Sequence, residues 1–122
     1  MLSFSMNGYR WRVLFDSPYS PNFIDRTGKL CVATTDPRTR TIYLSNRLAG
    51  DFLHTVLIHE LGHCALFSYN LLSDVHNAIP PQLWIEAEEW ICNLLADYGE
   101  EMFEISKSIL AVADEYNSLL AG

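Results

Sequence analysis

The feature that most constrains the fold of this chain is the pentad at residues 59–63, which has the pattern H-E-x-x-H inside a long apolar segment. Two histidines four residues apart project from the same face of a helix, about one turn apart, so both can bind one metal ion. The glutamate between them points to the flank, where it can reach a metal-bound water. The pattern therefore predicts a helix with a zinc site of the hydrolase type, in which His59 and His63 are ligands and Glu60 is the catalytic base.

The segments on both sides of the pentad are rich in large apolar residues. Those before it are Phe52, Val56, Leu57 and Ile58, and those after it are Leu61, Ala65, Leu66 and Phe67. A helix that is apolar nearly all round is covered on most sides, so we expect the pentad on a central helix. Buried imidazoles need polar partners, and a metal ion supplies one. Gly62 costs this helix about 1 kcal/mol relative to alanine, and its missing side chain would leave space for backbone or substrate close to the metal.

Length and composition predict one globular domain that spans residues 1–122. Of these residues 49% are hydrophobic and 19% are charged, as in ordinary soluble proteins. No apolar run is long enough for a membrane span, and the N-terminus lacks the basic and apolar regions of a signal peptide. Cys31, Cys64 and Cys92 cannot all pair and lack metal-binding spacing, so we expect reduced thiols in a cytoplasmic protein.

The net charge of −7 is divided unevenly along the chain. Residues 1–50 contain seven basic and three acidic side chains, whereas residues 51–122 contain one basic and twelve acidic side chains. An acidic half of this size argues against nucleic acid as the main partner. The basic half could bind an acidic partner, but attraction between the two halves of one domain is the simpler explanation of the uneven charge.

The predicted elements place strands before helices, which indicates the α+β class. β-rich runs at 11–15, 29–34 and 41–45 predict a small N-terminal antiparallel sheet, in which the last two runs form a hairpin around residues 35–40. Helices are expected at 47–69, 82–98 and 100–120, with a loop at 70–81. Residues 1–45 thus form the strand and loop part, and residues 46–122 form the helical part that carries the metal site. The apolar residues expected to pack the last helix are Phe103, Ile105, Ile109, Val112, Tyr116 and Leu119.

A catalytic zinc site requires a third protein ligand and an open position for water. The histidine-rich extension of the metzincins is absent, because Leu66 and Tyr69 occupy the places of its glycine and third histidine. The candidates are Asp74 and His76 in the loop, and Glu86, Glu88 and Glu89 on the second helix. Glu86 lies on a mostly polar helix face, whereas small residues at 92, 96 and 99 share a face with Glu89 and would let this helix approach the pentad helix. Periodicity therefore leaves Glu88 and Glu89 as the alternatives.

The pentad, the Thr-Ile-Tyr-Leu-Ser strand before it and the glutamate-bearing helix after it resemble the minimal gluzincins of the ImmA/IrrE type, over roughly residues 29–100. The likeness is closest to the small metallopeptidase-like proteins encoded in phages and prophages. It implies a zincin-like domain with Glu89 as the third zinc ligand and Asn93 as its neighbouring support, where the family usually has an aspartate. A second register of the family pattern would place the ligand at Glu86 instead.

The resemblance implies a zinc-dependent peptidase in the bacterial cytoplasm that acts on a protein or peptide, such as a regulator of a phage or mobile element. Zinc lowers the pKa of its bound water, and Glu60 accepts the proton and passes it to the leaving amine. The strand at 41–45 would pair with the extended peptide as an edge strand. Candidates for stabilising the oxyanion are Tyr43, His76 and Tyr116 and, more remotely, Tyr69 and Tyr98.

A second hypothesis is a gluzincin scaffold that has no catalytic activity and acts by docking a protein partner. The small size of the chain favours this hypothesis. The presence of Glu60 favours the enzyme, because a structural metal site does not require this residue. Neither hypothesis involves nucleic acid or a membrane, and the sequence leaves the oligomeric state open.

Overall fold

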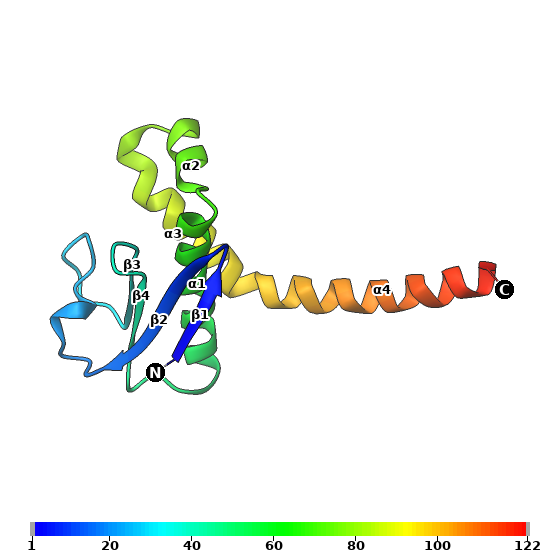
Figure 1. The fold of residues 1–122 in the computed structure, drawn as a ribbon, viewed down its shortest axis with the longest axis horizontal. Helices are drawn as coiled ribbons and strands as arrows, with labels where there is room; N and C mark the ends of the chain where they lie inside the picture. The colour runs from blue at the N-terminus through cyan, green and yellow to red at the C-terminus, as the bar shows by residue number, and fades with distance from the viewer. Residues whose placement is uncertain (1, 122) are drawn as a thin grey trace.

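A small sheet lies against a central helix, and one long helix projects from the other side of the molecule (Figure 1). This is a computed structural model, and it describes residues 2–121. The strands are β1 (Leu2–Met6), β2 (Tyr9–Asp16), β3 (Ala33–Asp36) and β4 (Thr41–Ser45). The helices are α1 (Gly50–Ser68), α2 (Leu72–Ala78), α3 (Trp84–Leu94), a π-helical segment (Leu95–Gly99) and α4 (Glu100–Ala121). The expected α+β class, with a small sheet followed by helices, is confirmed.

The four strands form one mixed sheet in the order β1-β2-β4-β3. β1 and β2 form a hairpin whose turn residues, Asn7 and Gly8, both have positive φ, as tight two-residue hairpin turns require. β3 and β4 form the expected second hairpin, although β3 begins at Ala33 instead of residue 29. The expectation of a wholly antiparallel sheet is wrong, because β2 and β4 run parallel. The whole segment between them, including β3, forms the crossover that parallel strands need.

The core lies between the sheet and α1. Trp11, Ile42 and Leu44 alternate along β2 and β4 with period two, so they point to the same face of the sheet, where they meet Cys64 of α1. The indole N–H of Trp11 donates to the hydroxyl of Ser68 at the end of α1, 2.9 Å away. This bond satisfies the polar atom of a completely buried side chain and ties β2 to the helix that carries the pentad.

Gly62 lets α3 pack closely against α1. A Cβ atom built on Gly62 would lie 3.0 Å from the sulfur of Cys92 and 3.4 Å from its Cα. The expectation that a small residue at position 92 allows close approach is therefore confirmed. The space beside Gly62 is filled by the neighbouring helix, so it is not a space for substrate.

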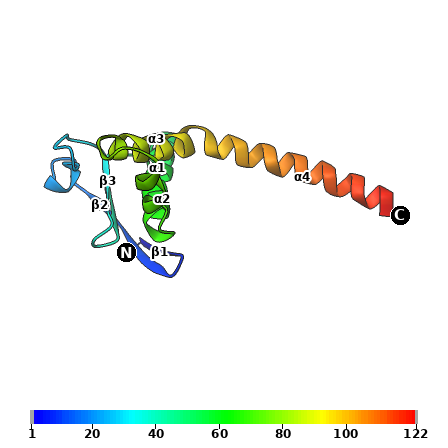
Figure 2. The same cartoon turned by 90° about the horizontal axis from the view of Figure 1, so that it is seen from above.

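Two expectations about the helical half are wrong. The segment expected as a loop at 70–81 contains α2. The apolar residues expected to pack the last helix are exposed, because α4 leaves the body as a free rod after the π-helical segment (Figure 2). In the described part of the chain, residues 2–121, none of the helices has the length and apolarity needed to cross a membrane.

Candidate metal centre

Helix α1 presents the two histidines of the pentad on one face, one turn apart. The Nε2 atoms of His59 and His63 lie 3.3 Å from each other, and both side chains are mostly buried. Glu60 points to the flank, with its nearer carboxylate oxygen 3.9 Å from Nε2 of His59. The spacing of the pentad has therefore produced the local geometry that the sequence predicted.

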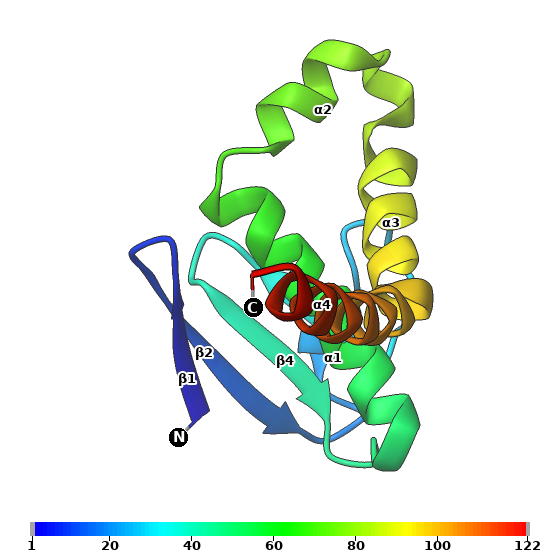
Figure 3. The same ribbon diagram turned by 90° about the vertical axis from the view of Figure 1, so that its right-hand side faces the viewer.

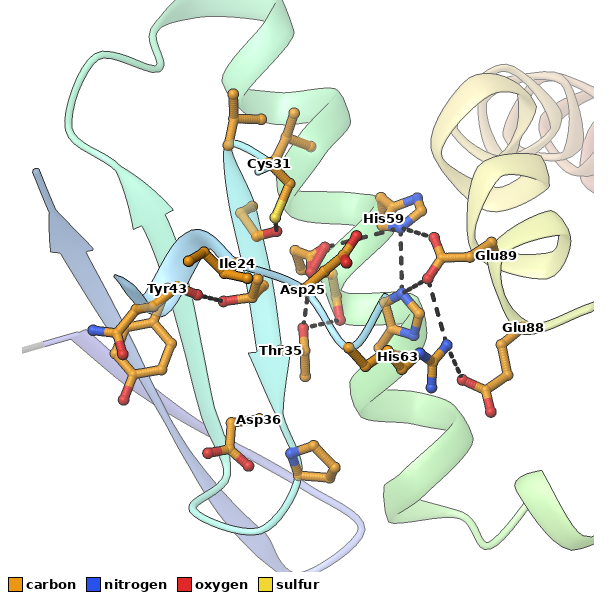
Figure 4. A pocket seen from close by; sticks show the side chains of 18 of the residues that line it. Ile24, Asp25, Cys31, Thr35, Asp36, Tyr43, His59, His63, Glu88 and Glu89 are labelled. Carbon is orange, nitrogen blue, oxygen red and sulfur yellow. Dashed lines mark hydrogen bonds and ion pairs between the residues drawn. The ribbon is translucent and has the colours of Figure 1, made fainter. Parts of the chain in front are cut away.

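Helix α3 brings Glu89 to the same point. One carboxylate oxygen of Glu89 lies 3.0 Å from Nε2 of His59 and the other lies 3.2 Å from Nε2 of His63 (Figure 4). Donor atoms of Glu60 and the two histidines also lie within 4.8 Å of one another, so Glu60 is a second candidate to complete the group. Glu89 fits better, because it contacts both histidines at hydrogen-bond distance whereas Glu60 contacts another partner.

That partner is Thr35 on β3. Its hydroxyl donates to the carboxylate of Glu60 at 3.1 Å, and the Glu60 side chain is almost completely buried. Burial raises the pKa of Glu60 above its usual value, and the nearby His63 and His59 partly oppose this effect. A buried carboxylate with a raised pKa, fixed by one hydrogen bond, has the properties of a general base.

Glu89 and His59 each stabilise the charged form of the other, and this shifts both pKa values. Hydrogen bonds from His59 and His63 hold the pKa of Glu89 far below its usual value. The bond to Glu89 is the main cause of the raised pKa of His59, and the side chain of Asn93 contributes the smallest effect in the same direction. Asn93 thus lies close enough to His59 to influence its imidazole.

Glu88 has different partners from Glu89. Its carboxylate lies 2.6 Å from the guanidinium of Arg26 and 3.4 Å from Nε2 of His76, whose ring stacks on Trp84. Arg26 also lies 3.6 Å from Glu89. The two candidates for the third ligand therefore have different surroundings: Glu88 faces Arg26, and Glu89 faces the two histidines.

Sequence reasoning missed Arg26 and Thr35. Arg26 lies in the loop between β2 and β3, more than 60 residues before the two glutamates that it contacts. The only signal in the sequence was the basic charge of the N-terminal half opposite an acidic helical half. That signal predicts attraction between the halves but identifies no pair.

A cavity of about 700 Å³ opens over the histidines, between α1, β3 and the loop that carries Arg26. Tyr43 is among its lining residues. The other oxyanion candidates are placed less well, since His76 is held against Trp84 and Glu88, and Tyr116 is exposed on the projecting helix α4. The expectation for Tyr116 is wrong because α4 does not fold back over the site.

Of the remaining ligand candidates, Glu86 and Asp74 are exposed, Glu86 on α3 and Asp74 on α2.

The cavity has polar chemistry on one wall and extended backbone on another. The two histidines, Glu88 and Glu89 line the helical wall, whereas β3 forms the opposite wall.

Comparison of the chain with models of known protein families and with curated proteins gives no match.

Proposed function

We propose that this chain is a zinc-dependent peptidase of the gluzincin type, similar to the ImmA/IrrE proteins. The observation that carries the proposal is the convergence of three side chains: the two imidazole Nε2 atoms lie 3.3 Å apart, and one oxygen of Glu89 lies 3.0 Å from His59 while the other lies 3.2 Å from His63. Tetrahedral zinc with ligand distances of about 2.0–2.1 Å requires donor separations of roughly 3.3–3.4 Å. Two histidines and a glutamate are also the donor set of a known class of catalytic zinc site.

In this proposal His59, His63 and Glu89 hold the ion, and Asn93 supports His59. Zinc bound there would supply Lewis-acid chemistry, which polarises a carbonyl group and makes water more acidic. Glu60 accepts the proton of the attacking water and delivers it to the leaving amine. Thr35 keeps the Glu60 carboxylate directed into the cavity through the 3.1 Å hydrogen bond.

The substrate that fits best is an extended peptide. The sequence suggested residues 41–45 as the edge strand, but β4 lies between β2 and β3, so β3 is the edge next to the site. An edge strand offers unpaired backbone N–H and C=O groups to an added strand. A peptide paired with β3 would run along the cavity wall formed by Ala33–Asp36, beside Glu60 and the histidines.

Arg26 has a positioning role in the proposed site. Its guanidinium lies between Glu88 and Glu89, at 2.6 and 3.6 Å, where it offsets the repulsion between two adjacent carboxylates. With Glu88 turned toward Arg26, Glu89 alone among the α3 glutamates is directed to the histidines. Arg26 therefore acts through Glu89 instead of touching the substrate.

Zinc binding is tested first, by elemental analysis and competition titration of the purified chain. We expect about one zinc per chain, with strong loss of affinity in His59→Ala, His63→Ala and Glu89→Ala. Glu86→Ala is the matched control, because it removes an exposed carboxylate from the same helix. Normal zinc binding by Glu89→Ala together with weak binding by Glu86→Ala would show that the ligand assignment is wrong.

Catalysis is tested with Glu60→Gln, which keeps the size of the side chain and removes the base. We expect this variant to fold, to bind zinc and to lose roughly 10²–10⁴-fold in peptide hydrolysis. The assay compares the new peptide termini in the proteomes of cells that express the wild type or the variant. Identical sets of termini at equal zinc content would refute the peptidase and leave the docking scaffold as the explanation.

A further inference from the structure

Helix α4 has an exposed apolar face that nothing in the described chain covers. It is a helix of 22 residues whose principal contacts are with the π-helical segment that leads into it. Figure 3 looks along this helix and shows its end well in front of the body. A solvated helix of this length is only marginally stable by itself, so apolar residues along it indicate packing against a partner.

Six of the nine large exposed apolar residues of α4 follow a heptad repeat, whereas Phe103, Leu110 and Leu120 lie off it. The six are separated by three and four residues in alternation, and we call them the α4 seam: Met102, Ile105, Ile109, Val112, Tyr116 and Leu119. Each is 51–81% exposed. A spacing of 3.5 residues is typical of a helix that pairs with another helix over its length.

The charges on α4 indicate which partner the seam fits. Four of its six charged residues, Glu100, Glu104, Lys107 and Asp114, lie at the outward positions of the heptad, away from the seam. The positions that flank the seam contain two charged residues, Glu101 and Glu115, and otherwise small or apolar side chains. Two copies of this helix can therefore pair with little like-charge repulsion. A basic partner helix would gain little from the seam, because few acidic groups lie beside it for its side chains to pair with.

The charge of α4 also excludes two other surfaces. With five acidic residues and one lysine, the helix would be repelled by anionic lipid and by nucleic acid.

The available area suits a second copy. A helix of 22 residues is about 33 Å long, and a stripe of about one third of its circumference gives on the order of 1,000 Å² for two copies, which is near the lower limit of specific interfaces.

We propose that the chain forms a homodimer in which the α4 seams of two copies pair as a coiled coil. The seam shares no residue with the metal centre, because Glu89 lies in the middle of α3 and the seam lies beyond the π-helical segment, on α4. The proposal does not depend on zinc or on catalysis.

The test compares two substitutions at adjacent positions of equal exposure. Ile109 lies on the seam and is 62% exposed, and Leu110 lies off the seam and is 60% exposed. Light scattering during size exclusion at about 100 µM should give twice 13.9 kDa for the wild type and for Leu110→Glu. Ile109→Glu should give 13.9 kDa. Urea unfolding followed by the fluorescence of Trp11, Trp84 and Trp90 together should give the same cooperative transition of the body in all three proteins.

Three results would overturn the proposal. They are a monomeric wild type at this concentration, a dimer that survives Ile109→Glu, and equal loss of the dimer in both variants. The last result would mean that apolar surface in general, and not the seam, causes association. Analysis of the metal-free protein should give the same masses, so failure of the zinc site leaves this test unaffected.

Discussion

Gly62→Ala is a direct test of the contact that positions Glu89, the proposed third metal ligand. In an ordinary helix this substitution stabilises by about 1 kcal/mol, because alanine loses less backbone entropy than glycine. Here the new Cβ would lie 3.0 Å from the sulfur of Cys92, 0.4 Å inside the 3.4 Å at which ordinary contacts begin. Cys92 is completely buried, so its sulfur cannot move aside easily.

The expected cost of this overlap is about 1–3 kcal/mol, which exceeds the gain in helix propensity. Gly62→Ala should therefore destabilise the protein by roughly 1 kcal/mol, or lower its melting temperature by roughly 3–6 °C. In a Cys92→Ala background the sulfur is gone, and the nearest remaining atoms of residue 92 lie at 3.4 Å. There the same substitution should stabilise by about 0.5–1 kcal/mol, so the sign reverses.

The assay is urea unfolding of the four proteins of this double-mutant cycle, with EDTA present so that metal binding does not contribute. A parallel zinc titration should show weaker binding in Gly62→Ala, because displacement of α3 moves Glu89 away from the histidines. If Gly62→Ala stabilises the protein in both backgrounds, α1 and α3 are not in close contact at this point. Glu89 would then not be held next to the histidines by this contact.

Three further predictions follow from single contacts. Burial raises the pKa of both Cys64 and Cys92 to about 12, so neither thiol should react with iodoacetamide at pH 8 until the protein unfolds, as mass spectrometry will show. Arg26→Met removes the closest partner of the buried Glu88 carboxylate and should cost roughly 1–3 kcal/mol in urea unfolding, and no loss would mean that the ion pair is absent in solution. Thr35→Val should cost about 1 kcal/mol and leave the zinc content unchanged, since it removes a hydrogen bond to Glu60 and no proposed ligand. Loss of zinc in Thr35→Val would place Glu60 among the ligands.

The local part of the site could be predicted from the sequence because it depends only on helix geometry. His59 and His63 are four residues apart on one helix, so their imidazoles converge wherever that helix lies. The hairpin at β3 and β4 follows from turn chemistry between two β-rich runs for the same reason, since its partners are close in the chain. Patterns that are local in the sequence were sufficient in both cases.

Only the tertiary structure shows which of Glu88 and Glu89 lies next to the histidines. Adjacent residues on a helix differ by about 100° in direction, so the outcome depends on how α3 is rotated against α1. That rotation is set by the contact of Gly62 with Cys92 and by the salt bridge from Arg26 to Glu88. Both contacts join residues 30 or more positions apart, and periodicity within one helix carries no information about such pairs.

The parallel pairing of β2 with β4 and the exposure of α4 have the same kind of cause. The pairing of distant strands and the burial of a helix face depend on which surfaces of the folded chain meet. Several surfaces of one chain have an apolar pattern that could form such a contact, so the pattern alone does not identify the partner. The apolar repeat of α4 is present in the sequence, but a helix that packs on its own body and one that projects from it can both show such a repeat. What the sequence determined by itself is the chemistry of the pentad and the faces of its helix. Only the folded chain decided which distant groups complete the site, because those contacts depend on the relative placement of whole elements.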